Sequence, residues 1–217
     1  MLELNNILDA SQKSLEIAAT CVKSGGVIIA PSDTNVALTI NPWIEESIDR
    51  IFKIKGRPAT SPLTLFVLEP DEWKEYAESE DAETVDLLTK AFWPGPLNII
   101  LKKKETVSNR MVCGGDTVSI GCLSNTLWRN FMKTLEMPVA MTSANLSGQA
   151  DGILVDFDLA CEQVGDKVDY LLPGEDINTT ASSTIISLVG EPVILRLGDI
   201  TKEEIEAVIK KEVRLKA

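Results

Sequence analysis

The chain has 217 residues, 44% of them hydrophobic and 25% charged, which excludes wholesale disorder and favours one good-sized globular domain over residues 1–217. Its 33 acidic and 21 basic residues give a formal net charge of −12, which opposes tight binding to bulk nucleic acid and favours a small anionic substrate in a local basic cleft. The chain contains no histidine, so catalysis by an imidazole base and histidine-ligated zinc are excluded.

The start of the chain lacks the basic residues and apolar core of a signal peptide, and no apolar run reaches membrane-spanning length. We therefore expect a cytoplasmic protein with no membrane partner. None of the cysteines has Cys-x-x-Cys spacing, which favours ordinary reduced thiols at Cys21, Cys113, Cys122 and Cys161.

The first predicted element is a helix that ends at Gly25-Gly26, and its inward face carries Leu15, Ala18, Ala19 and Val22. A buried strand over 27–30 follows and leads into the polar turn 31–34. A second helix runs from about Ile44 to Lys55. These three segments predict one strand–loop–helix unit.

The rest of the chain alternates between apolar strands and helices. The acidic stretch 69–83 is expected to be a solvated helix or loop, and the last residues a charged, fraying end. A capping-box pair, Thr201 with Glu204, starts the last helix. This alternation predicts an α/β fold with a twisted, open, mixed β-sheet and flanking helices. Strands are predicted over 63–68, 97–101, 118–120, 139–141, 183–188 and 193–195, and a helix over 84–92.

Two polar clusters interrupt these apolar elements. Lys55-Gly56-Arg57-Pro58 places two cations one residue apart, which suits an anion site. The segment 142–148, Thr-Ser-Ala-Asn-Leu-Ser-Gly, follows a predicted strand, so its hydroxyl and amide groups lie where open α/β sheets bind ligands. Each cluster also has a simpler interpretation, because cations favour helix C-termini and hydroxyls cap turns. Thr117 and Arg196 adjoin other strands, so the sheet can gather the whole set at one edge.

The order and separation of these motifs resemble the YrdC/Sua5 family of L-threonylcarbamoyladenylate synthases over most of the chain. The segments that carry the resemblance are Pro31-Ser32-Asp33-Thr34, Lys55-Gly56-Arg57-Pro58 with Pro62-Leu63, Trp93-Pro94-Gly95-Pro96, Thr142-Ser143-Ala144-Asn145-Leu146-Ser147-Gly148, Ser183-Thr184 and Ile194-Leu195-Arg196.

This resemblance implies an ATP-dependent nucleotidyltransferase that joins L-threonine, bicarbonate and ATP into threonylcarbamoyladenylate and pyrophosphate, for N6-threonylcarbamoyladenosine at adenosine 37 of tRNA. It implies that Lys55 and Arg57 are catalytic and hold the triphosphate, with Mg²⁺ carried by ATP. The implied nucleotide contacts are Arg57, Ser61, Thr117, Ser143, Asn145 and Arg196, and the implied threonine contacts are Thr34, Thr142 and Ser183. The chain is similar to the short, single-domain members, in which partner proteins carry out the transfer to tRNA.

The chain also departs from the family pattern. Val36 and Ala37 stand where the family has tyrosine and glycine, Phe66 stands where some members have histidine, and Gly121 replaces an arginine expected to pair with the threonine carboxylate. Losing such a partner typically weakens affinity by about a hundredfold. Two alternatives therefore stay open. One is a diverged paralogue that uses another amine or carbamoyl donor, and the other is a non-catalytic module that binds double-stranded RNA, which the net charge opposes.

Overall fold

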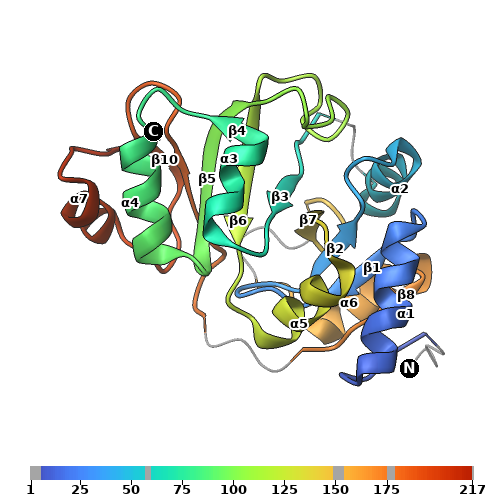
Figure 1. Ribbon diagram of the computed structural model, residues 1–217. Helices are drawn as coiled ribbons and strands as arrows, with labels where there is room; N and C mark the ends of the chain where they lie inside the picture. Colours follow the sequence, from blue (N-terminus) through green and yellow to red (C-terminus); the bar gives the residue numbers. More distant parts are fainter. Residues whose placement is uncertain (1–5, 57–59, 149–153, 175–178, 217) are drawn as a thin grey trace.

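The computed structural model describes residues 6–56, 60–148, 154–174 and 179–216, and its centre is one mixed β-sheet (Figure 1). The strand order is β11-β10-β9-β5-β6-β3-β7-β2-β1-β8, and β4 pairs with β5 outside this path. The strands are β1 Ile28–Ala30, β2 Ala37–Ile40, β3 Thr64–Phe66, β4 Ala77–Glu78, β5 Gly95–Lys103, β6 Thr117–Cys122, β7 Val139–Ser143, β8 Tyr170–Leu171, β9 Thr184–Ser187, β10 Val193–Arg196 and β11 Arg214–Leu215.

Helices pack on both faces of this sheet and confirm the predicted fold class. They are α1 Gln12–Lys23, α2 Glu45–Lys55, α3 Trp73–Tyr76, α4 Ala82–Phe92, α5 Thr126–Leu135, α6 Phe157–Val164 and α7 Lys202–Ile209, with 3-10 turns at Pro70–Glu72 and Gly165–Lys167. Side-chain caps explain several helix starts: Asp81 accepts from the Thr84 backbone N–H, and Thr201 with Glu204 forms the predicted capping box. Figure 1 shows α1 and α7 at opposite sides of the molecule.

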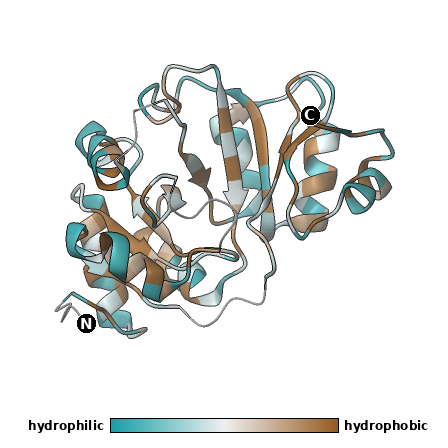
Figure 2. Ribbon diagram, turned by 180° about the vertical axis from the view of Figure 1, so that it is seen from behind, coloured by the Kyte–Doolittle hydropathy of each residue, from teal (hydrophilic) through white to brown (hydrophobic). Residues whose placement is uncertain are grey.

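The two faces of the sheet are covered unequally. On one face, alternate strand residues such as Leu97 and Ile99 join the larger core together with residues of α2, α4, α6 and α7. On the other face, α1 and α5 pack on β1, β2, β3 and β7 through a smaller core that contains Trp128 and Phe131. Figure 2 shows hydrophobic residues concentrated along the strands between these helices. The part of the second face formed by β5, β9 and β10 is left open.

Four expectations from the sequence are wrong. Residues 27–55 form no simple strand–loop–helix unit, because β2 follows the polar turn and pairs antiparallel with β1. Segment 69–83 is only partly solvated, since Trp73 is buried and β4 pairs with β5. The end of the chain forms β11, which pairs in parallel with β10 and is anchored by the buried Val213.

The fourth wrong expectation is that the sheet gathers the site residues at one of its edges. Neighbouring strands alternate in direction along much of the sheet, so their carboxyl ends point to opposite edges.

Two predictions about the chain as a whole can be compared with the structure. All four cysteines lie in the described ranges, and none of them forms a disulfide there, as the spacing indicated. No helix in the described ranges is both long enough and apolar enough to cross a bilayer.

Candidate functional site

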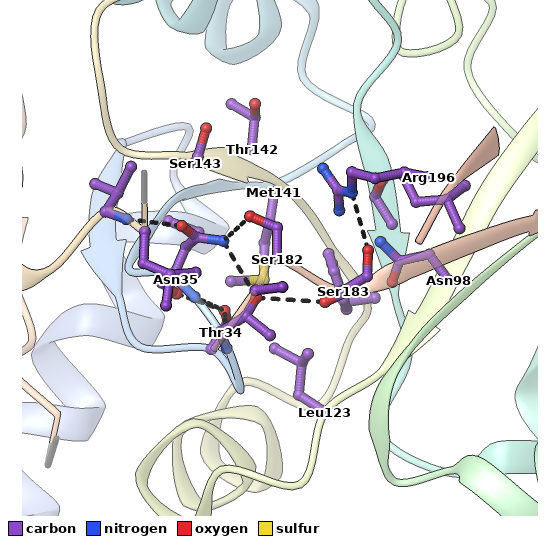
Figure 3. Close-up of a pocket in the computed structure, with 18 of the residues that line it drawn as sticks. Thr34, Asn35, Asn98, Leu123, Met141, Thr142, Ser143, Ser182, Ser183 and Arg196 are labelled. Carbon is purple, nitrogen blue, oxygen red and sulfur yellow. Dashed lines mark hydrogen bonds between the residues drawn. The ribbon is translucent and has the colours of Figure 1, made fainter. Parts of the chain in front are cut away.

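A cavity of about 620 Å³ opens on the same face of the sheet as α1 and α5, since Ala37, Phe66 and Met141 belong both to its lining and to the smaller core. Its floor is made of side chains from neighbouring strands, and its walls come from loops around 32–35, 142–145, 154–155 and 180–183 (Figure 3). The floor residues are Ala37, Thr64, Phe66, Asn98, Met141, Ile185 and Arg196.

One wall joins the two polar clusters found in the sequence. Lys55 ends α2, is only 3% exposed, and lies behind Ser143 and Asn145, which line the cavity. Its Nζ donates to the Ser143 carbonyl oxygen at 2.5 Å and to the Asn145 carbonyl oxygen at 2.8 Å, and Ser143 Oγ donates to Asn145 Oδ1 at 2.6 Å. The Ser147 backbone N–H donates to the Lys55 carbonyl at 3.0 Å. The two clusters therefore form one structural unit.

A second wall brings together the hydroxyls expected to contact threonine. Thr34 and Ser183, 149 positions apart in the sequence, share a hydrogen bond of 3.3 Å between their hydroxyl oxygens, and both are at most 7% exposed. Asn35 Nδ2 donates to Thr34 Oγ1 at 3.2 Å and to Ser182 Oγ at 3.1 Å, while its Oδ1 accepts from the Val155 backbone N–H at 2.8 Å (Figure 3). Asn35 therefore fixes three segments of the wall relative to one another.

The loop that carries Thr34 is anchored by Asp33. Its carboxylate accepts the backbone N–H groups of Ser124 and Asn125 at 2.7–2.9 Å and the Ser124 hydroxyl at 3.0 Å, just before α5 begins. Burial raises the pKa of Asp33, while these hydrogen bonds act in the opposite direction. The N-terminal end of α5 thereby sets the position of the wall that carries Thr34.

Arg196 supplies the positive charge of the cavity floor. Its Nε donates to the Ser183 carbonyl at 2.9 Å, and the rest of the guanidinium is open to the cavity (Figure 3). The surrounding walls desolvate this group and lower the pKa of Arg196, although an arginine remains charged at neutral pH. Among the described residues no carboxylate lines the cavity, so a guanidinium and several hydroxyls together favour an anionic, hydrogen-bonding ligand.

The remaining predicted site residues do not all line the cavity. Thr142 lines the cavity, but within the described ranges Ser61 and Thr117 do not. Thr117 lies on the same face of β6 as Ser119, further along the strand from the cavity. Arg57 lies outside the described residues.

Asn35, Phe66, Asn98 and Ser182 are among the lining residues that reasoning from the sequence did not assign to the site. Asn98 left a signal, because asparagine is disfavoured inside a strand and stands here between Leu97 and Ile99. Asn35 and Ser182 adjoin predicted site residues, and only the fold shows that their side chains meet.

Comparison with known proteins finds a matching family model and several similar proteins. A family model for Sua5, YciO and YrdC proteins, described as "Telomere recombination", matches residues 20–198. The threonylcarbamoyl-AMP synthase of Pyrococcus abyssi is 33% identical over 90% of this chain, and that of Bacillus subtilis is 28% identical over 96%. A crystal structure of P. abyssi Sua5 complexed with L-threonine matches 97% of the chain with a TM-score of 0.90 and 30% identity.

These relatives are longer than the region they share with this chain. The match covers 57% of the P. abyssi synthase sequence, 60% of the B. subtilis sequence and 62% of the chain in the P. abyssi crystal structure. The chain thus spans less than two thirds of their length.

Proposed function

The chain belongs to the Sua5/YciO/YrdC family, and from this membership we propose that it is a threonylcarbamoyl-AMP synthase acting on L-threonine, bicarbonate and ATP. The observation that carries the proposal is the composition of one cavity. It combines the Ser143–Asn145 wall supported by Lys55, the Thr34–Ser183 hydroxyl pair and the Arg196 guanidinium. An amino acid and a polyphosphate both need this mixture of donors and positive charge.

The reaction proceeds in two balanced steps. The neutral amine of threonine forms a bond to the carbon of bicarbonate and water leaves, which gives a carbamate. A carbamate oxygen then attacks the α-phosphorus of ATP, the bond to the oxygen that bridges the α- and β-phosphorus atoms breaks, and pyrophosphate leaves. Both steps depend mainly on positioning and on stabilisation of negative charge, so a chain without histidine can support them.

The residues divide between the two substrates as follows. Ser143, Asn145 and Arg196 bind the nucleotide, and Arg57 holds the triphosphate as the motif predicts. Thr34, Thr142 and Ser183 contact threonine. Mg²⁺ would enter with ATP, held mainly by phosphate and water oxygens, and the hydroxyl oxygens of the cavity wall are compatible with such a hard cation.

The first test is a pyrophosphate-release assay with ATP, Mg²⁺, L-threonine and bicarbonate. We expect release that requires all three substrates and that falls by about a hundredfold in Arg57→Ala, since a charge-assisted contact to the triphosphate is lost. Arg110→Ala is the matched control, because Arg110 pairs with Asp49 on the surface. Silence of the wild type with the complete substrate set would refute the proposal.

The product is expected to serve tRNA modification in the cytoplasm, with transfer to tRNA carried out by partner proteins. The acidic composition supports the expectation that other proteins bind the tRNA, because the net charge of −12 repels the phosphate backbone of RNA.

A further inference from the structure

A row of side chains crosses the cavity floor at the place where the chain departs from its family. In register, Arg196 of β10 stands beside Ile185 of β9, Ile185 beside Asn98 of β5, Asn98 beside Gly121 of β6, and Gly121 beside Phe66 of β3. All five residues belong to the same face of the sheet. Gly121 is the one residue of this row that has no side chain, and Asn98 is its direct neighbour on β5.

Asn98 is a nearly buried amide without a partner. It is 7% exposed and lines the cavity, yet across the described ranges its side chain makes no hydrogen bond. The other asparagines of the cavity differ, since Asn35 and Asn145 use both their amide oxygen and their amide nitrogen within the protein. Buried polar groups are almost always paired, so the Asn98 carboxamide points to a ligand as its missing partner.

The space that Asn98 uses is available only because residue 121 is glycine. A Cβ atom built at Gly121 would lie 2.6 Å from Asn98 Oδ1 and 2.6 Å from Phe66 Cε1, far inside van der Waals contact. Asn98 and Phe66 therefore occupy the volume into which an arginine at 121 would project. The family resemblance assigns that arginine to the carboxylate of threonine, so in this chain a neutral amide lies where the resemblance places a charged guanidinium.

We propose that Asn98 is the specificity-determining residue of the amine site and that its carboxamide, in place of an arginine at 121, hydrogen-bonds the α-carboxylate of L-threonine. This inference rests on the proposed function. Asn98 lines the same cavity as Ser183, whose hydroxyl meets that of Thr34 (Figure 3), so the three side chains can contact one small polar ligand. Phe66 and Leu123 add apolar surface to the same cavity, which suits a ligand with a short side chain.

A neutral amide has a consequence that an arginine would not have. Its Nδ2 donates to a carboxylate, and its Oδ1 accepts equally well from a neutral amide N–H. We therefore expect wild type to discriminate between L-threonine and L-threoninamide by less than about tenfold, whereas a guanidinium would favour the carboxylate by about a hundredfold.

The test measures pyrophosphate release and isothermal titration with L-threonine and L-threoninamide on the wild type and three variants. Asn98→Ala should raise the KM for threonine about tenfold or more and leave the KM for ATP within about twofold. Asn98→Asp should lower the affinity for threonine by about a hundredfold, because two carboxylates repel each other. The same variant should keep or improve the affinity for threoninamide. Ser187→Ala, a polar residue of the same sheet face outside the cavity, should behave as wild type.

The opposite effects of Asn98→Asp on the two ligands separate recognition from structural damage, which would weaken both together. An active wild type with unchanged threonine parameters in Asn98→Ala and Asn98→Asp overturns the inference alone. A parallel loss of both ligands in Asn98→Asp overturns it as well, because Asn98 would then only support the fold. A wild type that neither binds threonine nor releases pyrophosphate overturns the proposed function and this inference with it.

Discussion

Lys55 is expected to support both the cavity wall and the proposed reaction. Its ammonium is buried against carbonyl oxygens of Ser143 and Asn145, so removing it leaves these acceptors without their donor. We expect Lys55→Ala to lower the free energy of unfolding by on the order of 3 kcal/mol and to abolish pyrophosphate release. Denaturant unfolding and the release assay measure the two effects. Lys53→Ala, an exposed lysine of the same helix, should change neither.

The two readouts decide what Lys55 does. If Lys55→Ala is inactive but as stable as wild type, Lys55 acts on the triphosphate alone, and its support of the cavity wall is dispensable.

Gly121 is the second position at which a single side chain matters. Adding a methyl group there brings it within 2.6 Å of Asn98 and Phe66, and Phe66 cannot retreat freely because its ring packs edge-on against Trp128 at a centroid distance of 6.3 Å. Overpacking of this kind typically destabilises by about 1–3 kcal/mol, which is the loss we expect for Gly121→Ala in urea unfolding. The control is Gly115→Ala, whose added methyl would meet its nearest atom at 3.2 Å. Equal stability of the two variants would contradict the crowding at 121.

At the scale of elements, α5 holds the loop of Thr34 through Asp33. An asparagine at 33 would turn an N–H group toward the backbone donors of Ser124 and Asn125, leaving one of them unpaired. We expect Asp33→Asn to lower the free energy of unfolding by about 1–3 kcal/mol and to raise the KM for threonine. Asp156→Asn is the matched control, because Asp156 only caps α6 and asparagine caps equally well. A stable Asp33→Asn with wild-type KM would show that α5 does not set the loop.

The α4 and α7 ends are joined by an acid-sensitive contact. Hydrogen bonds from Lys211 and Thr84 lower the pKa of Asp81 from 3.8 to about 2. A carboxylate whose pKa is lowered by folding stabilises the folded state at any pH above the pKa that it has in the unfolded chain. This contribution is lost as the pH falls from about 4 to 2. The free energy of unfolding should therefore fall less steeply over this range in Asp81→Asn, and likewise in Lys211→Met, than in wild type. Identical slopes in all three proteins would show that the contact does not act in solution.

Local signals in the sequence explain which elements could be foreseen. The spacing of Leu15, Ala18 and Val22 and the Thr201–Glu204 box depend only on neighbouring residues, and α1 and α7 confirm both. β2 could not be foreseen, because Ala37 and Leu38 become a strand only by pairing with β1 and β7. The same limit applies to the site. Thr34 and Ser183 follow from motifs, whereas the position of Asn98 beside Gly121 follows only from the register of β5 and β6.

For the whole molecule, net charge and topology answer different questions. A charge of −12 concerns partners: it disfavours RNA as a direct ligand and leaves the local charge of Arg196 to attract a small anion. Topology concerns cooperativity. β3, β7 and β2 belong to the same hydrogen-bonded sheet as β5 and β9, so the larger and the smaller core share strands and cannot easily separate.

This sharing predicts that the chain unfolds as one domain. Trp128 lies in the smaller core, whereas Trp73 and Trp93 lie in the larger one, so tryptophan fluorescence can follow each core separately. We compare Trp128→Phe with a variant that keeps only Trp128, and we record far-UV circular dichroism of each as the global signal. Trp128→Phe should still fold, because the indole N–H of Trp128 is buried without a hydrogen-bond partner and nothing polar is left unpaired by its removal. Within each variant, the urea midpoints by fluorescence and dichroism should coincide. If Trp128 reports a midpoint clearly below that of the dichroism, α1 and α5 unfold first with their strands, and the single-domain prediction fails.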